Sequence, residues 1–148
     1  MDWITREIAI GDFAEARDHA LLQLGGFASI LGLIDILQGR SPADLGVRYI
    51  EIVPLVDGPG NDFDDFRRAV LTLERLAAEA APVLVHCFAG MGRSPTVVAG
   101  YLMKARGLTP EQAVAEVAAR REISILPDMH ALLVRLHRAL GEAPEGGP

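Results

Sequence analysis

The distribution of hydrophobic and polar positions divides the chain into alternating strands and helices. Short apolar runs and strict alternation predict strands, whereas apolar positions spaced by three or four residues predict helices. We expect strands over residues 8–10, 27–33 and 47–53, and in the apolar run that follows Pro82. We expect helices over residues 13–24, from 61 or 62 to about 80, and over 95–106, 110–121 and 127–140.

Residues with preferences for helix ends support these boundaries. Gly25-Gly26 ends the first helix, because glycine readily adopts the left-handed conformation that follows a helix. Asn61 or Asp62 caps the long helix, since short polar side chains accept hydrogen bonds from its first free N–H groups. Ser41-Pro42 indicates a loop between two strands. The long helix has one apolar face, made of Phe66, Val70, Leu73 and Leu76.

The order of these elements predicts the fold class. Strands that alternate with helices favour an α/β fold, here a single domain with a mostly parallel central sheet flanked by helices on both faces. With 148 residues, half of them hydrophobic, the chain can bury one sizeable core. We expect the domain to cover residues 1–140 and the Gly-, Pro- and Glu-rich residues 141–148 to form a disordered tail.

Composition and charge limit the classes of binding partner and the compartment that we expect. A net charge of −6 argues against nucleic acid, which is bound by basic surfaces. No apolar run reaches the roughly 18 residues of a membrane span, and Met1-Asp2-Trp3 lacks a secretory pattern. One cysteine cannot form an internal disulfide, which agrees with a reducing compartment. We therefore expect a cytoplasmic protein without a membrane partner, and we favour a monomer. No cluster of metal ligands is evident, so neither metal nor cofactor is expected.

The most informative segment is His86–Ser94, which reads HCFAGMGRS between a predicted strand and a predicted helix. Gly90 and Gly92 let such a loop fold inward, so that its backbone N–H groups and the helix N-terminus can hold a tetrahedral anion. The planar guanidinium of Arg93 can bind two phosphate oxygens. The same positive field favours the thiolate of Cys87, a ready nucleophile. A buried cysteine can also be inert, but the combination of residues favours a phosphate site.

These residues resemble a known family. His-Cys, five residues and Arg-Ser is similar to the signature loop of protein tyrosine phosphatases, and Arg93-Ser94-Pro95-Thr96 is most similar to the small dual-specificity branch. Ile8–Asp12, Gly26–Leu31 and Arg121–Ile123 are similar to further segments of the family. The resemblance implies the same α/β fold and a phosphatase activity. The chain reads Pro127-Asp128 where the family usually has Pro-Asn.

The resemblance also implies roles for individual residues. Cys87 would attack phosphorus while Asp57, in a Gly- and Pro-rich loop after a strand, protonates the leaving oxygen; Asp62 is the alternative donor, and Asp57 could instead only shape a turn. Ser94 would donate a hydrogen bond to the sulfur, and His86 would support the loop by bonding its backbone. The phosphate would be bound by Phe88, Ala89, Gly90, Met91, Gly92 and Arg93.

The substrate follows less directly. Relatives that hydrolyse polyanionic phosphoinositides usually have basic residues at the variable loop positions, whereas Phe88, Ala89 and Met91 carry no charge. The resemblance therefore implies a phosphoprotein substrate, with phosphotyrosine, and also phosphoserine or phosphothreonine, favoured over phosphoinositides. A phosphoinositide or other small phosphomonoester phosphatase, a non-catalytic phosphate-binding domain and a sulfurtransferase remain as alternatives. Arg121 could bind a second phosphate or an acidic substrate, or lie on a solvated helix surface; for Arg120 the solvated surface is favoured.

Overall fold

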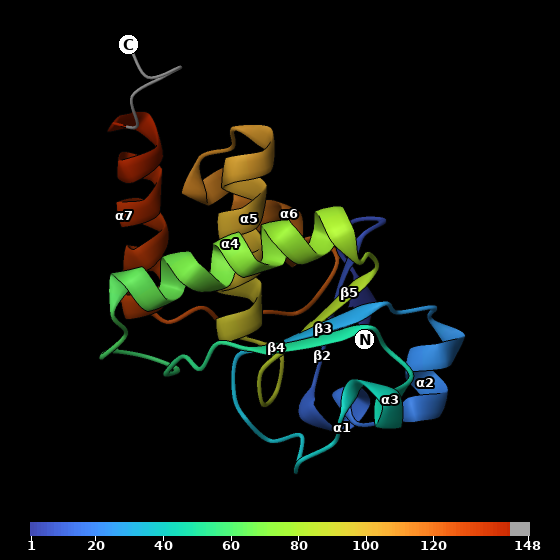
Figure 1. Cartoon of the computed structure of the whole chain (residues 1–148). Helices are drawn as coiled ribbons and strands as arrows, with labels where there is room; N and C mark the ends of the chain where they lie inside the picture. Colours follow the sequence, from blue (N-terminus) through green and yellow to red (C-terminus); the bar gives the residue numbers. More distant parts are fainter. Residues whose placement is uncertain (143–148) are drawn as a thin grey trace.

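The computed structural model describes residues 1–142 and contains one five-stranded sheet with the strand order β1-β2-β5-β3-β4 (Figure 1). Strands β2, β5, β3 and β4 run parallel to one another, and β1 alone pairs antiparallel with β2. The strands are β1 (Asp2–Trp3), β2 (Ile8–Gly11), β3 (Ser29–Gly32), β4 (Tyr49–Ile52) and β5 (Val83–His86). The predicted mostly parallel sheet is confirmed.

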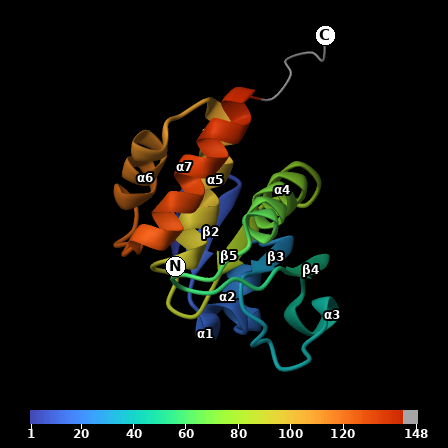
Figure 2. The ribbon, with the colours of Figure 1, turned by 90° about the vertical axis from the view of Figure 1, so that its left-hand side faces the viewer.

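Helices cover both faces of the sheet, as predicted (Figures 1 and 2). One face carries α4 (Phe63–Glu79), α5 (Arg93–Arg106), α6 (Pro110–Ala118) and α7 (Pro127–Glu142). The opposite face carries α1 (Phe13–Ala16), α2 (His19–Leu24) and α3 (Pro42–Leu45). None of the helices within residues 1–142 is long and apolar enough to cross a bilayer.

The central strands bury side chains on both faces, because each face is covered by helices. In β5, Val83 and Val85 pack into the larger core beneath α4–α7, whereas Leu84 packs into the smaller core beneath α1–α3. In β3, Leu31 and Ile30 divide between the two cores in the same way. The predicted apolar face of α4 is confirmed, since its four residues are all buried.

The region predicted as one helix over residues 13–24 is two helices, α1 and α2. Asp18 lies between them with an extended backbone, and its side-chain Oδ1 accepts a hydrogen bond from the N–H of Leu21 at 3.1 Å. An aspartate that bonds backbone N–H groups three residues ahead starts a new helix. The periodic apolar pattern continues across this break, so the periodicity alone did not reveal it.

Other boundaries also differ from the prediction. The Ser41-Pro42 segment starts α3 rather than a plain loop, because Ser41 and Asp44 bond reciprocally as a capping box. The short strand β1 was not predicted, and α6 ends at Ala118. α7 continues to Glu142, two residues beyond the predicted end of the last helix. The remaining residues of the expected tail, 143–148, lie outside the described part of the chain.

The sheet brings three loops together at the carboxyl ends of its parallel strands, the edge at which α/β sheets bind ligands. His86, the last residue of β5, is in register with Gly11 of β2 and with Gly32 of β3. Beyond β4, the chain turns back over this edge, where the N–H of Leu55 bonds the carbonyl of Leu33 at 3.0 Å. The residues after β3, β4 and β5 therefore lie together at this edge of the sheet.

Candidate active site

The segment that follows β5 forms a tight loop around the only cysteine. We call residues 87–93 the phosphate loop. Cys87 is 2% exposed, and the N–H of Gly90 donates to its Sγ at 3.2 Å. Gly90 has a φ of +73°, a conformation that favours glycine and that turns the loop back over the sulfur. The loop leads directly into α5, so its end coincides with a helix N-terminus.

A pocket of about 480 Å³ opens above the sulfur. It is lined by Ile34, Asp57, Cys87, Phe88, Ala89, Met91, Gly92, Arg93, Ser124 and Leu126. The predicted nucleophile, cation and acid, which come from two distant segments of the chain, therefore share one cavity. A pocket with a thiol on its lining and a guanidinium at its side can hold a small tetrahedral anion.

Arg93 is the first residue of α5 and reaches across to the loop after β4. Its Nη1 donates to the carbonyl oxygen of Leu55 at 3.2 Å, and its buried Nε has no hydrogen-bond partner within residues 1–142. An unpartnered, buried donor on a cation is costly unless a ligand completes it. The side chain is thus placed to receive an anion in the pocket.

The structure separates the two candidate acids. We call residues 56–61 the acid loop. The Asp57 side chain, in this loop, lines the pocket, and its Oδ1 approaches Gly92 so closely that a β-carbon there would lie 2.6 Å away. Asp62 instead caps α4, accepting from the N–H of Asp64 at 2.9 Å. Asp62, the alternative candidate, does not line the pocket.

Asn61 closes the acid loop, a contact that the sequence did not reveal. Its Oδ1 accepts from the N–H of Val56 at 2.7 Å, while its Nδ2 donates to the carbonyls of Val56 at 2.6 Å and Gly58 at 3.2 Å. One side chain therefore ties both sides of Asp57. From the sequence, Asn61 is predicted only as a possible cap of the long helix.

His86 supports the phosphate loop from the buried side. Its Nδ1 lies 3.1 Å from the carbonyl oxygen of Cys87, so the expected contact with the loop backbone is confirmed. Burial, which removes water from the charged imidazolium, lowers the pKa of His86 below its ordinary value of 6.5. The contact with the Cys87 carbonyl opposes this shift, and the nearby charge of Arg93 adds to it. The ring is therefore a neutral support at physiological pH.

Ser94 does not make the hydrogen bond to the sulfur that the resemblance implies. Its hydroxyl is fully buried at the start of α5 and has no hydrogen-bond partner within residues 1–142. Ser94 directly follows Arg93 and is the second residue of α5.

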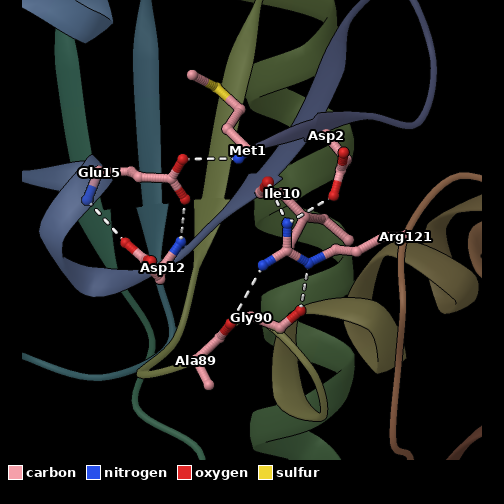
Figure 3. Close-up of polar contacts among 8 residues, drawn as sticks. All are labelled: Met1, Asp2, Ile10, Asp12, Glu15, Ala89, Gly90 and Arg121. Atoms are coloured by element: carbon pink, nitrogen blue, oxygen red, sulfur yellow. Dashed lines mark hydrogen bonds and ion pairs between the residues drawn. The ribbon is translucent and has the colours of Figure 1, made fainter.

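Arg121 does not lie on a solvated helix surface, so that expectation is wrong, and it is not among the residues that line the pocket. Its side chain is 12% exposed and lies behind the phosphate loop (Figure 3). Nε and Nη2 donate to the carbonyls of Gly90 and Ala89, and Nη1 donates to the Ile10 carbonyl and to the Asp2 carboxylate. Four of the five N–H donors of the guanidinium are therefore engaged with the protein. Arg120 is exposed, as favoured.

Sequence reasoning missed three residues of the pocket wall. Ser124 and Leu126 come from the link before α7, and Ile34 comes from the segment after β3. The Ser124 N–H bonds the Met91 carbonyl at 2.7 Å, which ties this link to the phosphate loop. The sequence places residues 122–126 only as a link between two predicted helices, and a link has no periodic pattern that shows which side chains face a pocket. Within residues 1–142, no three His, Cys, Asp or Glu side chains form a group that could hold a metal ion.

Comparison with known proteins agrees with this geometry. The family described as "Dual specificity phosphatase, catalytic domain" matches residues 38–135. Dual specificity protein phosphatase 13B of Mus musculus is 31% identical over 146 residues, covering 89% of this chain and 72% of the relative. Dual specificity protein phosphatase 1 of Arabidopsis thaliana is 29% identical over 121 residues, covering 82% of this chain and 60% of the relative. The chain belongs to the dual specificity phosphatase family, within the protein tyrosine phosphatase superfamily.

Solved structures show the same fold. Human DUSP28 superposes with a TM-score of 0.83 at 23% identity, covering 95% of this chain and 98% of that one. PTPMT1 superposes with a TM-score of 0.80 at 22% identity and covers 99% of both chains. At these identities the similarity establishes the architecture and leaves substrate and activity to be argued from the site.

Proposed function

We propose that this protein is a cysteine-dependent phosphatase that hydrolyses phosphomonoesters through a cysteinyl-phosphate intermediate. The observation that carries the proposal is the shared pocket, in which the Cys87 thiol, the Arg93 guanidinium and the Asp57 carboxyl surround one cavity. Membership of the dual specificity phosphatase family supports it. Because the reaction needs a free thiol, we also propose a reducing compartment such as the cytoplasm.

The first step transfers the phosphoryl group to sulfur. The thiolate of Cys87 forms a bond to phosphorus as the bond to the leaving oxygen breaks, and protonated Asp57 gives its proton to that oxygen. Arg93 and the backbone N–H groups of the phosphate loop stabilise the charge on the equatorial oxygens, which is the main requirement of phosphoryl transfer. Gly90 already directs its N–H toward the sulfur.

The second step regenerates the enzyme. The carboxylate of Asp57 accepts a proton from a water molecule, whose oxygen bonds phosphorus as the sulfur–phosphorus bond breaks. Phosphate and the Cys87 thiolate result, and the Ser94 hydroxyl is proposed to reorient toward the sulfur as it departs. No co-reactant beyond water is needed.

Phosphorylated proteins are the proposed substrates, with phosphotyrosine as the most suitable residue. Three exposed apolar side chains line the pocket, namely Phe88, Met91 and Leu126. Such a lining can contact an aromatic ring as well as a short aliphatic ester. None of these side chains adds positive charge for a polyanionic headgroup.

A small phosphomonoester is the alternative substrate. A structure of PTPMT1 in complex with PI(5)P shares this fold at a TM-score of 0.75 and 23% identity. A side-by-side assay of a phosphotyrosine peptide and PI(5)P decides between them, and we expect a higher kcat/KM for the peptide. A higher value for PI(5)P would replace the substrate assignment and leave the chemistry unchanged.

Hydrolysis of p-nitrophenyl phosphate by the wild type, Cys87→Ser and Asp57→Asn tests the chemistry. We expect turnover by Cys87→Ser to be abolished, because a hydroxyl in this pocket remains protonated. Asp57→Asn should lower kcat by about 10²-fold and change the pH profile, as for the loss of a positioned acid. Undiminished hydrolysis by Cys87→Ser would exclude the covalent route. Formation of a persulfide from thiosulfate by the wild type would instead support a sulfurtransferase.

A further inference from the structure

Arg121 contacts the backbone of the phosphate loop and is not among the residues that line the pocket. Its side chain lies between β1, β2 and the loop, and Figure 3 shows it directed at all three. Nε donates to the Gly90 carbonyl at 2.7 Å and Nη2 to the Ala89 carbonyl at 3.1 Å. Nη1 donates to Asp2 Oδ2 at 2.9 Å and to the Ile10 carbonyl at 3.2 Å.

The two loop carbonyls determine where the neighbouring N–H groups point. In a trans peptide, the C=O and N–H bonds point in opposite directions. The peptide between Ala89 and Gly90 therefore has its oxygen on Arg121 and its N–H on Cys87 Sγ, 3.2 Å away. This single peptide links the guanidinium to the sulfur. The next peptide has its oxygen on Arg121, which leaves the Met91 N–H facing away from the guanidinium.

Gly90 allows this close contact. A β-carbon on Gly90 would lie 2.6 Å from Arg121 Nη2 and 2.8 Å from the Gly11 carbonyl oxygen. No side chain fits between the loop and the arginine, so the glycine and the arginine form one unit. Hydrogen bonds from a charged donor are stronger than those from a neutral one, and they polarise the peptide they reach.

We propose that Arg121 is a positioning residue for the phosphate loop, which holds two peptides with their N–H groups toward the sulfur and the anion and thereby sustains the ionised thiol. This inference rests on the proposed phosphatase function. A purely structural role would tie β1 to the domain without affecting ionisation of the sulfur.

Other charged groups lie in or near the site and must be held constant in a test. Arg93 and Asp57 line the pocket, His86 precedes Cys87, and Asp2 pairs with Arg121. The charges of Asp12 and Arg17, the residues at the two ends of α1, act on His86. Substituting Arg121 alone changes none of these side chains.

The test is the pH dependence of alkylation by iodoacetamide, which reports the thiolate directly because Cys87 is the only cysteine. Arg121→Met removes the charge and the fork, and Arg120→Met is the matched control, since it removes the same charge from the exposed neighbour. We expect Arg121→Met to raise the pH of half-maximal alkylation by about one unit and to lower kcat/KM at pH 6 about tenfold. Arg120→Met should leave both unchanged. Equal values for the two variants would overturn the proposal.

A second pair of variants, Arg121→Lys and Arg120→Lys, keeps the test decisive if Arg121→Met does not fold, which circular dichroism would show. Lysine keeps the charge but loses the planar fork. Arg121→Lys should lower kcat/KM at least about threefold relative to Arg120→Lys, and equal rates would overturn the proposal. Alkylation does not require turnover. A wild type that hydrolyses no phosphomonoester would contradict the proposed function, while the upward shift in Arg121→Met would still support the role of Arg121.

Discussion

Gly92 allows the acid to approach the phosphate loop. A β-carbon at this position would lie 2.6 Å from Asp57 Oδ1 and 3.3 Å from the Ser124 carbonyl oxygen. Its φ of −121° is available to any residue, so the requirement for glycine here is steric and comes from its neighbours. Gly90 differs, because its φ is positive. The two loop positions therefore require glycine for different reasons: Gly90 for its backbone conformation and Gly92 for the space that Asp57 needs.

Replacing Gly92 with alanine should displace Asp57 and remove its proton donation. The loss should depend on the leaving group, because p-nitrophenolate is the more stable anion and its departure needs the proton less than the departure of phenolate does. We expect kcat/KM for phenyl phosphate to fall at least about tenfold more than that for p-nitrophenyl phosphate. Gly141→Ala, where a β-carbon meets no atom within 4 Å, is the control and should have no effect. Equal losses on both substrates would show that the methyl group disturbs the loop itself.

Individual residues differ in how far the sequence revealed them. Cys87 and Arg93 were identifiable because the motif places them on one short loop. Asp57 was predicted from the family resemblance and its place after a strand, and it lines the same pocket. The direction of Arg121 was not, since its partner Asp2 is 119 positions away and its other acceptors are backbone carbonyls. Backbone acceptors leave no trace in the residue pattern.

Longer elements were predicted more accurately than short ones. α4 was predicted nearly to the residue, because seventeen residues repeat one apolar face and an aspartate caps it. α3 has four residues and β1 has two, too few for any period to show. β1 exists because it pairs with β2, a tertiary contact. Local pattern therefore predicted the layers of the fold and missed the elements that depend on packing.

The acid loop and α4 meet at two adjacent residues with different tasks. Asn61 bonds the backbone on both sides of Asp57, whereas Asp62 bonds the first turn of the helix. Asn61→Ala should loosen the loop and lower kcat about tenfold with little change in KM, because an acid that is no longer held in place donates less often. Steady-state kinetics with phenyl phosphate measures this split.

Asp62→Ala is the matched control for Asn61→Ala. It should lower the free energy of unfolding by about 1 kcal/mol, the usual cost of losing an N-cap. Its kcat should stay near that of the wild type, because the acid loop keeps its closing contacts. If both variants lost stability and kcat in parallel, Asn61 would have no specific role in holding the acid.

The whole molecule assembles the site from segments that the sheet brings to one edge. Asp2 and Ile10 lie behind the phosphate loop, Asp57 reaches it from beyond β4, and Ser124 reaches it from the link before α7. His86 stands at the centre, at the end of the strand between β2 and β3. Such a position is fully buried, so its protonation affects the stability of the fold as well as the site.

The lowered pKa of His86 predicts how stability depends on pH. Since the folded pKa lies below the unfolded value of 6.5, the unfolded chain binds more protons between the two values. Stability from the neutral ring is therefore fully present above about pH 6.5 and is lost as the pH falls through the folded pKa. Urea unfolding between pH 7.5 and 5 should show the free energy of unfolding decreasing. His86→Gln should show a shallower decrease, whereas His137→Gln, at an exposed position on α7, should keep the wild-type slope. Equal slopes in all three proteins would mean that other groups, rather than the buried imidazole, cause the dependence.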